Sequence, residues 1–283
     1  MNMILEVNGL NKKLGAFSLS NISFNIPEGC IAGFIGANGA GKTTTIKLIL
    51  GLVHKDAGSI KLFGKDFEHN ERELKNNIGV VFDEGYFYEQ LTLEEMKNII
   101  APAYSNWDEK VYKSNISHFN LDKKQKISTL SKGMRMKFAI SLALSHHSKL
   151  LIMDEPTSGL DPLVRSELMN LLLDFMKEEG LGVLFSSHIT SDLDKIADIL
   201  ILIDNGKILL NEEKDSLLDT YGLVKGDTKE LTEAARKLFI KINETQFGFS
   251  GLTTKKSEVR QLMRGIQIER PTIEDIMLGY IGR

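Results

Sequence analysis

A glycine-rich stretch at residues 36–43, GANGAGKT, contains the residue types that bind a phosphate chain. It fits the spacing G-x-x-x-x-G-K-[ST], in which glycines let the backbone turn its N–H groups toward phosphate oxygens. The lysine can reach the β- and γ-phosphates, and the hydroxyl that follows it can ligate Mg²⁺. A chance match is the alternative, but the apolar strand before the loop and the helix after it supply the required context. We therefore predict a nucleotide site formed by Gly36, Asn38, Gly39, Ala40, Gly41, Lys42, Thr43 and Thr44.

Two carboxylates follow an apolar strand in LLIMDEP, residues 150–156. Asp154 could hold Mg²⁺ through water, and Glu155 could polarise an attacking water as general base. A solvent-facing acidic turn is the alternative. His188 follows a further apolar strand, GVLFSS. A histidine at a strand end is usually a surface residue, but ligands of open α/β sheets bind at this edge, so His188 could contact the γ-phosphate and orient Glu155.

The elements that must position these residues are short apolar runs alternating with amphipathic ones, which favours a parallel α/β core. Residues 4–26 show β-like alternation, and residues 88–147 are predicted to form a mostly helical insert. Thr92 and Glu95 have capping-box spacing at its start. Asp161 and Pro162 suit the first positions of a further helix. Residues 216–283 are expected to form a small α/β appendage that packs on itself or on the core.

The bulk composition excludes several other classes of protein. The net charge of −3 gives no general attraction to nucleic acid or anionic lipid. A single cysteine, Cys30, cannot form an intrachain disulfide, and the N-terminal residues lack the features of a signal peptide. No apolar run approaches the roughly 20 residues that span a bilayer. We therefore expect a soluble chain whose membrane role, if any, depends on a partner.

Five motifs in fixed order make the chain resemble the ATP-binding cassette family, the nucleotide-binding subunits of ABC transporters. They are GANGAGKTT, LSKGM (130–134), LLIMDEP, SGLD (158–161) and SSH (186–188), and the resemblance covers about residues 3–215. It implies an α/β fold: a P-loop ABC ATPase core with an N-terminal antiparallel β subdomain, a helical signature subdomain and a small C-terminal α/β appendage. It also implies a nucleotide-binding domain at 1–215, with its helical subdomain at about 88–147, and an accessory region at 216–283.

The resemblance further implies ATP and Mg²⁺ as ligands and a dimer in which each ATP lies between two subunits. Glu155 and His188 would be the general base and the switch, and Asp161 would run along the dimer interface. LSKGM corresponds to the signature that faces the second subunit's ATP, through Ser131, Lys132 and Gly133. Metal ligands would be Thr43, Asp83 and Asp154. The second ATP-binding subunit could be identical or different, and no nucleic-acid partner is expected.

Three positions depart from the family pattern. Lys132 and Met134 stand where glycine and glutamine are usual, and Lys132 is expected to point to solvent rather than to a phosphate. Asp83 replaces the glutamine that commonly follows the IGVVF strand, and Glu84 could substitute for it. The aromatic residue that usually stacks on adenine falls at Leu14, so nearby Phe17 is the candidate.

Within the family, YSNWDEKVY, LSKGMRMK and RPTIEDIMLGYI resemble ATPase subunits of bacterial ABC-2-type exporters, a subgroup linked to drugs and antimicrobial peptides. The expected function is ATP hydrolysis that powers transport through a separate membrane permease, at the cytoplasmic face of the membrane. The alternative is a soluble ABC ATPase without a membrane partner. A GTPase or kinase is a third class, which LSKGM and SGLD disfavour.

Overall fold

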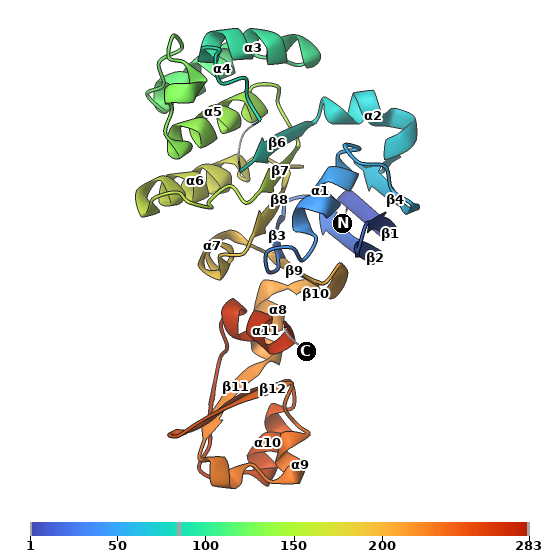
Figure 1. The fold of residues 1–283 in the computed structure, drawn as a ribbon, viewed down its shortest axis with the longest axis vertical. Coiled ribbons are helices and arrows are strands. Elements are labelled where there is room, and N and C mark those ends of the chain that lie inside the picture. Colours follow the sequence, from blue (N-terminus) through green and yellow to red (C-terminus); the bar gives the residue numbers. More distant parts are fainter. Residues whose placement is uncertain (1, 84–85, 282–283) are drawn as a thin grey trace.

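The computed structural model describes residues 2–83 and 86–281, which form an elongated molecule built around three β-sheets (Figure 1). A group of helices lies at one end, the largest sheet lies in the middle, and the C-terminal residues form the other end (Figure 1). The predicted α/β class is confirmed. Within the described residues, none of the helices has the length and apolar character needed to cross a bilayer.

The central sheet has six strands: β3 (Ile31–Ile35), β6 (Ile78–Phe82), β7 (Leu150–Asp154), β8 (Gly182–Ser187), β9 (Ile199–Asp204) and β10 (Lys207–Glu213). Their order is β10-β9-β3-β8-β7-β6, and all neighbouring pairs are parallel except β9 with β10. β3, β7 and β8 are buried along their whole length, as expected for parallel strands covered on both faces. Their carboxyl ends therefore bring distant parts of the chain to one edge.

The N-terminal antiparallel sheet covers one face of the central sheet. It contains β1 (Met3–Leu14), β2 (Phe17–Pro27), β4 (Ala57–Leu62) and β5 (Lys65–Asp66), in the order β2-β1-β4-β5. One apolar cluster joins Val7 of β1 and Phe24 of β2 to Phe34 of β3. Helix α1 (Lys42–Ile49) contributes Ile46 to the same cluster, and α2 (Phe67–Lys75) contributes Phe67. The glycine-rich loop is thus fixed between β3 and a helix that is anchored in this core.

Three helices follow β6 and form the helical end of the molecule: α3 (Leu93–Ile100), α4 (Glu109–His118) and α5 (Lys132–Leu144). Two 3-10 turns, at Ala101–Ala103 and Ile127–Thr129, connect them. Thr92 and Glu95 form the predicted capping box of α3. Tyr112 and Phe138 are fully buried in a small core of this region. The other face of α5 packs on the central sheet, so α5 links the helical region to that sheet.

Two helices flank the strands that carry the predicted catalytic residues: α6 (Pro162–Phe175) and α7 (Thr190–Ile196). Asp161 caps α6 by accepting hydrogen bonds from the backbone N–H groups of Leu163 and Val164, as predicted. A partly buried ion pair joins the two helices, with 2.5 Å between Arg165 Nη2 and Asp192 Oδ1. This ion pair ties α6 to α7.

The C-terminal residues form a sheet with its own apolar core. After α8 (Lys214–Thr220), the strands run in the order β12-β13-β11-β14; they are β11 (Gly222–Gly226), β12 (Lys241–Thr245), β13 (Gly248–Thr253) and β14 (Gln267–Glu269). A 3-10 turn (Thr228–Glu230), α9 (Glu233–Arg236) and α10 (Lys256–Leu262) complete this part. The last helix, α11 (Ile273–Tyr280), returns to the core, where Ile273 and Ile276 share a cluster with Leu193 of α7. The appendage therefore packs both on itself and on the core.

A buried histidine between the central sheet and the helical end should make stability depend on pH. The ring of His146 stacks on Tyr104 at 3.8 Å, and its Nδ1 lies 3.1 Å from the carbonyl oxygen of Asn76. Burial lowers the pKa of His146 from 6.5 to about 4. Between these values the unfolded chain binds a proton that the folded chain does not, so the free energy of unfolding should fall by about 3 kcal/mol as the pH drops through this window.

Urea unfolding at pH 7 and pH 4 tests this expectation. His146→Gln should lose less stability than the parent over the same interval, because the titrating group is gone. His118→Gln removes an exposed histidine and should lose as much as the parent. A parent and a His146→Gln variant with the same pH dependence would show that His146 is not the group responsible.

Candidate functional site

The glycine-rich loop is held in a tight turn by close backbone contacts. Gly41 has φ +117°, and a Cβ there would lie 2.6 Å from Leu19 Cδ2. A Cβ on Gly36 would lie 2.4 Å from the carbonyl oxygen of Ile203. Only glycine fits these positions, because the first needs a left-handed backbone and both lack room for a side chain.

Lys42 lies inside this loop with 5% of its surface exposed. Its Nζ donates hydrogen bonds to the carbonyl oxygens of Gly36, at 2.7 Å, and Ala37, at 3.2 Å. Lys42 is also the first residue of α1, whose N-terminus carries no side-chain cap. Uncapped backbone N–H groups at a helix N-terminus favour an anion. The loop therefore combines an ammonium group with free backbone donors, which is the chemistry that a phosphate chain requires.

The remaining predicted loop residues surround this lysine. Ala40 is buried; Thr43 and Thr44 are half-buried in the first turn of α1; and Asn38 and Gly39 are exposed at the tip. Phe17 lies against the loop, since a Cβ on Gly41 would be 3.1 Å from its Cζ.

Two carboxylates reach the same edge from β7. Asp154 is 6% exposed, and its Oδ1 accepts a hydrogen bond of 2.7 Å from the Ser186 hydroxyl on β8. The backbone N–H of Glu155 donates to the same hydroxyl oxygen at 3.0 Å. Ser186 thus fixes both acidic positions. The role of this serine is not apparent from the sequence, although it belongs to the SSH motif and precedes His188 by two residues.

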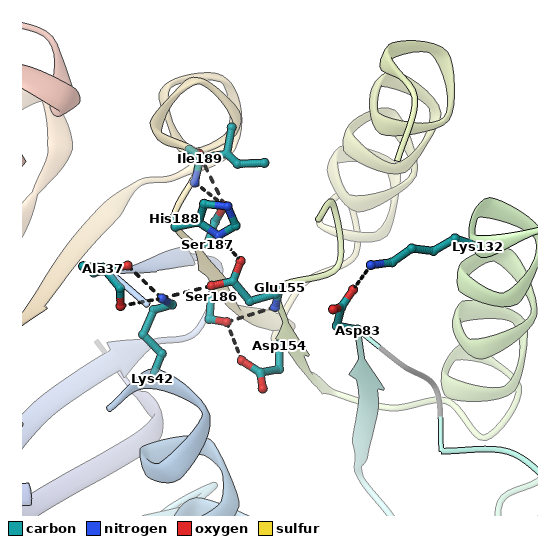
Figure 2. Close-up of polar contacts among 11 residues, drawn as sticks. Ala37, Lys42, Asp83, Lys132, Asp154, Glu155, Ser186, Ser187, His188 and Ile189 are labelled. Carbon is teal, nitrogen blue, oxygen red and sulfur yellow. Dashed lines mark hydrogen bonds and ion pairs between the residues drawn. The ribbon is translucent and has the colours of Figure 1, made fainter. Parts of the chain in front are cut away.

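Glu155 lies between the loop lysine and the predicted switch histidine (Figure 2). Its Oε1 is 3.0 Å from Lys42 Nζ, and its Oε2 is 2.5 Å from His188 Nδ1. The Glu155 side chain is 16% exposed and that of His188 is 39% exposed. The backbone of Glu155 has φ +52°, a left-handed conformation that is uncommon for a residue with a side chain. Three strand ends therefore bring a cation, a carboxylate and an imidazole together, as the sequence predicted.

The signature residues lie apart from this group. Ser131 caps α5 by accepting a hydrogen bond of 3.2 Å from the backbone N–H of Met134. Gly133 faces Val164 of α6, where a Cβ would be 3.3 Å from the nearest methyl carbon. Figure 2 shows α5 on the other side of Glu155 from Lys42. Within the described residues, no hydrogen bond or ion pair joins Ser131 or Gly133 to Lys42 or Glu155.

One expectation about this region was wrong. Lys132 does not simply point to solvent: its Nζ lies 2.5 Å from Asp83 Oδ1, directly after β6 (Figure 2). The aspartate that stands where glutamine is usual therefore meets the lysine that stands where glycine is usual. Glu84, named as a substitute for Asp83, lies outside the described residues.

Comparison with known proteins decides the family. The sequence profile described as "ABC transporter" matches residues 19–158. The chain is 35% identical over 217 residues to the bacitracin transport ATP-binding protein BcrA of Bacillus licheniformis, covering 74% of this chain and 69% of that protein. The chain belongs to the ABC transporter ATP-binding family. ABC ATP-binding cassette proteins are ATPases whose activity is coupled to transport, and this chain is therefore an ATPase.

Further similarities agree with this membership. The lantibiotic transport ATP-binding protein SrtF of Streptococcus pyogenes is 34% identical over 215 residues, covering 75% of this cassette chain and 92% of that protein. A solved ATP-binding subunit of an ABC transporter superposes with a TM-score of 0.70 at 30% identity, covering 76% of this chain and 92% of that one. The GTPase and kinase alternatives are therefore not favoured.

Proposed function

We propose that this cassette binds and hydrolyses ATP as one half of a dimer and thereby powers export through a separate membrane subunit. The observation that carries the proposal is the contact of Glu155 with both Lys42 and His188. Because Lys42 would bind the phosphates, the Glu155 carboxylate beside it could activate a water that attacks the γ-phosphate.

The glycine-rich loop would bind the triphosphate. Lys42 would exchange its carbonyl partners for β- and γ-phosphate oxygens, and the first backbone N–H groups of α1 would add further donors. Thr44 would donate to a second phosphate, and Phe17, which lies beside Gly41, is the candidate for stacking on adenine.

The oxygen ligands at this edge fit Mg²⁺, which prefers carboxylate and hydroxyl oxygens. Asp154 is a buried carboxylate at a strand end, and Thr43 supplies a hydroxyl in the first turn of α1. These two residues would hold the ion, with Asp83 as a third predicted ligand. The ion would neutralise charge on the β- and γ-phosphates.

Glu155 would act as the general base and His188 would orient it. A carboxylate bound on both sides, by an ammonium and by an imidazole, has its two oxygens fixed in direction. Pre-organisation of this kind is what a base needs, because general catalysis depends on position as well as pKa. Ser186 would act as a positioning residue that supports both carboxylates.

The second half of each nucleotide site would come from another ATP-binding subunit. Ser131 and Gly133 lie at the N-terminus of α5 and make no direct contact with Lys42 or Glu155 among the described residues. An N-terminus on another subunit could approach the γ-phosphate from the opposite side. Asp161, at the start of α6, would lie along the same interface.

A membrane subunit would bind near the helical region. An apolar hollow between β6 and the helices is lined by Val80, Phe82, Phe87, Ile100, Tyr104 and Leu142. The relatives are named as bacitracin and lantibiotic transport proteins, which supports export rather than a soluble role. The cassette would then lie on the cytoplasmic face of the membrane, held there by its partner.

Affinity purification from detergent-solubilised membranes tests this proposal. The tagged chain should carry with it a protein with several membrane-spanning helices, and Ile100→Asp should reduce that recovery about tenfold or more, because it places a charge in an apolar contact. Leu52→Asp changes an exposed leucine just after α1, which does not line the hollow, and should have no effect. Recovery of no membrane protein by the parent chain would favour the soluble alternative.

A further inference from the structure

Two residues of opposite charge connect the catalytic strands to the signature helix. Asp83 follows β6 of the central sheet, and Lys132 is the first residue of α5. The Nζ of Lys132 lies 2.5 Å from Asp83 Oδ1, with 39% of the lysine side chain and 35% of the aspartate side chain exposed. The two positions are far apart in sequence, so this ion pair is a tertiary contact between two separate parts of the fold.

The side chain of Lys132 also covers the loop before α6. Gly159 has φ +65°, and a Cβ there would lie 3.4 Å from Lys132 Nζ and 3.5 Å from its Cδ. Gly159 precedes Asp161, the residue that caps α6, by two positions. Lys132, at the start of α5, therefore lies against both Asp83, which follows β6, and the loop that leads to α6.

The charges around Lys132 would allow its ammonium group to exchange Asp83 for another anion. A cation in the first turn of a helix is disfavoured by the helix dipole, and the first turn of α5 contains no acidic residue. Asp83 is the partner that offsets this unfavourable charge. One turn along, Arg135 Nη1 lies 2.6 Å from Glu89 Oε1, so a second pair ties α5 to the chain after β6. A triphosphate carries more negative charge than one carboxylate and would compete for Lys132.

We propose that the Lys132–Asp83 pair is a charge latch between the catalytic core and the signature helix. In the nucleotide-free chain it holds the start of α5 against β6 and the loop before α6. A nucleotide bound by the second subunit opens the latch by drawing Lys132 from Asp83 to its phosphates. Lys132 is thus a positioning residue of the signature helix that becomes a phosphate ligand. This inference rests on the proposed two-subunit site.

Two variants that remove the same ion pair should have different effects on the ATP concentration for half-maximal hydrolysis. Asp83→Gln keeps a side-chain oxygen for a metal but frees Lys132. The ATP concentration for half-maximal hydrolysis should then fall by about two- to fivefold, the size expected for a partly exposed pair. Lys132→Met removes both the latch and the cation, so this concentration should not fall. Lys132→Arg keeps the charge and should behave as the parent does.

Hydrogen–deuterium exchange of the nucleotide-free chain reads the latch directly. The amides in the first turn of α5 should exchange faster in Asp83→Gln and in Lys132→Met, and the double variant should be no faster than either. An unchanged exchange rate in Asp83→Gln, or equal half-saturating ATP concentrations in Asp83→Gln and Lys132→Met, would overturn the latch.

A measurement of ATP binding distinguishes failure of the latch from failure of the proposed nucleotide site. Equilibrium binding of ATP by the parent chain reports on the loop around Lys42 and does not depend on whether the latch exists. A parent chain that does not bind ATP would count against the proposed nucleotide site. Intact binding together with unchanged exchange in Asp83→Gln would count against the latch alone.

Discussion

Replacing Glu155 by glutamine should leave ATP binding intact and slow hydrolysis by about 10²- to 10⁴-fold, the range of a general base. Glutamine has the shape of glutamate and can still accept a hydrogen bond from Lys42, so the site should keep its geometry. It lacks the basic oxygen that would take a proton from water. Steady-state phosphate release at saturating ATP measures the loss.

The control for this variant is a glutamate in an exposed ion pair. Glu73 lies 2.5 Å from Lys65, and more than half of each side chain is exposed. Glu73→Gln removes a carboxylate from a Lys–Glu pair just as Glu155→Gln does, but it lies outside the site and should hydrolyse ATP at the parent rate. A Glu155→Gln variant as active as Glu73→Gln would show that Glu155 is not the base.

Replacing Lys42 by methionine should weaken ATP binding by roughly 10- to 100-fold, because a charged hydrogen-bond donor to the phosphates is lost. Methionine keeps much of the length of the lysine stem, so the buried space inside the loop stays filled. The dissociation constant for ATP, measured by calorimetry, gives the effect. Hydrolysis at limiting ATP should fall at least as far.

Lys65→Met is the matched control for this second variant, since it removes a lysine from the exposed pair with Glu73. Its affinity for ATP should equal that of the parent. Folding of Lys42→Met should be checked by thermal unfolding, because Lys42 donates hydrogen bonds to Gly36 and Ala37 in the free chain. A folded Lys42→Met variant with parental affinity would place the phosphates elsewhere.

The convergence of Lys42, Glu155 and His188 could be predicted because each lies in the segment that follows a recognisable apolar strand. Parallel strands end at one edge of a sheet, so the loop of Lys42, the carboxylate of Glu155 and the ring of His188 had to converge there. The helix caps made by Thr92, Ser131 and Asp161 can also be predicted from the sequence, because capping depends on residues only a few positions apart.

Contacts between distant positions could not be predicted in this way. The pairing of Lys132 with Asp83 depends on how α5 packs against β6, and nothing in either local sequence specifies the other. The shared role of Ser186 depends on the register of β7 and β8, which places Asp154 opposite it. The domain boundaries inferred from sequence patterns stay predictions, since α5 and α11 each pack on the central core.

The identity of the bound nucleotide after one turnover tests the central claim most directly. The parent and Glu155→Gln would each be mixed with Mg²⁺ and labelled ATP, freed of unbound nucleotide and quenched, and the bound nucleotide would be separated by chromatography. We predict that the parent yields ADP while Glu155→Gln retains ATP in similar amount. ADP formed by Glu155→Gln at the parental rate would contradict the assignment of hydrolysis to the carboxylate between Lys42 and His188.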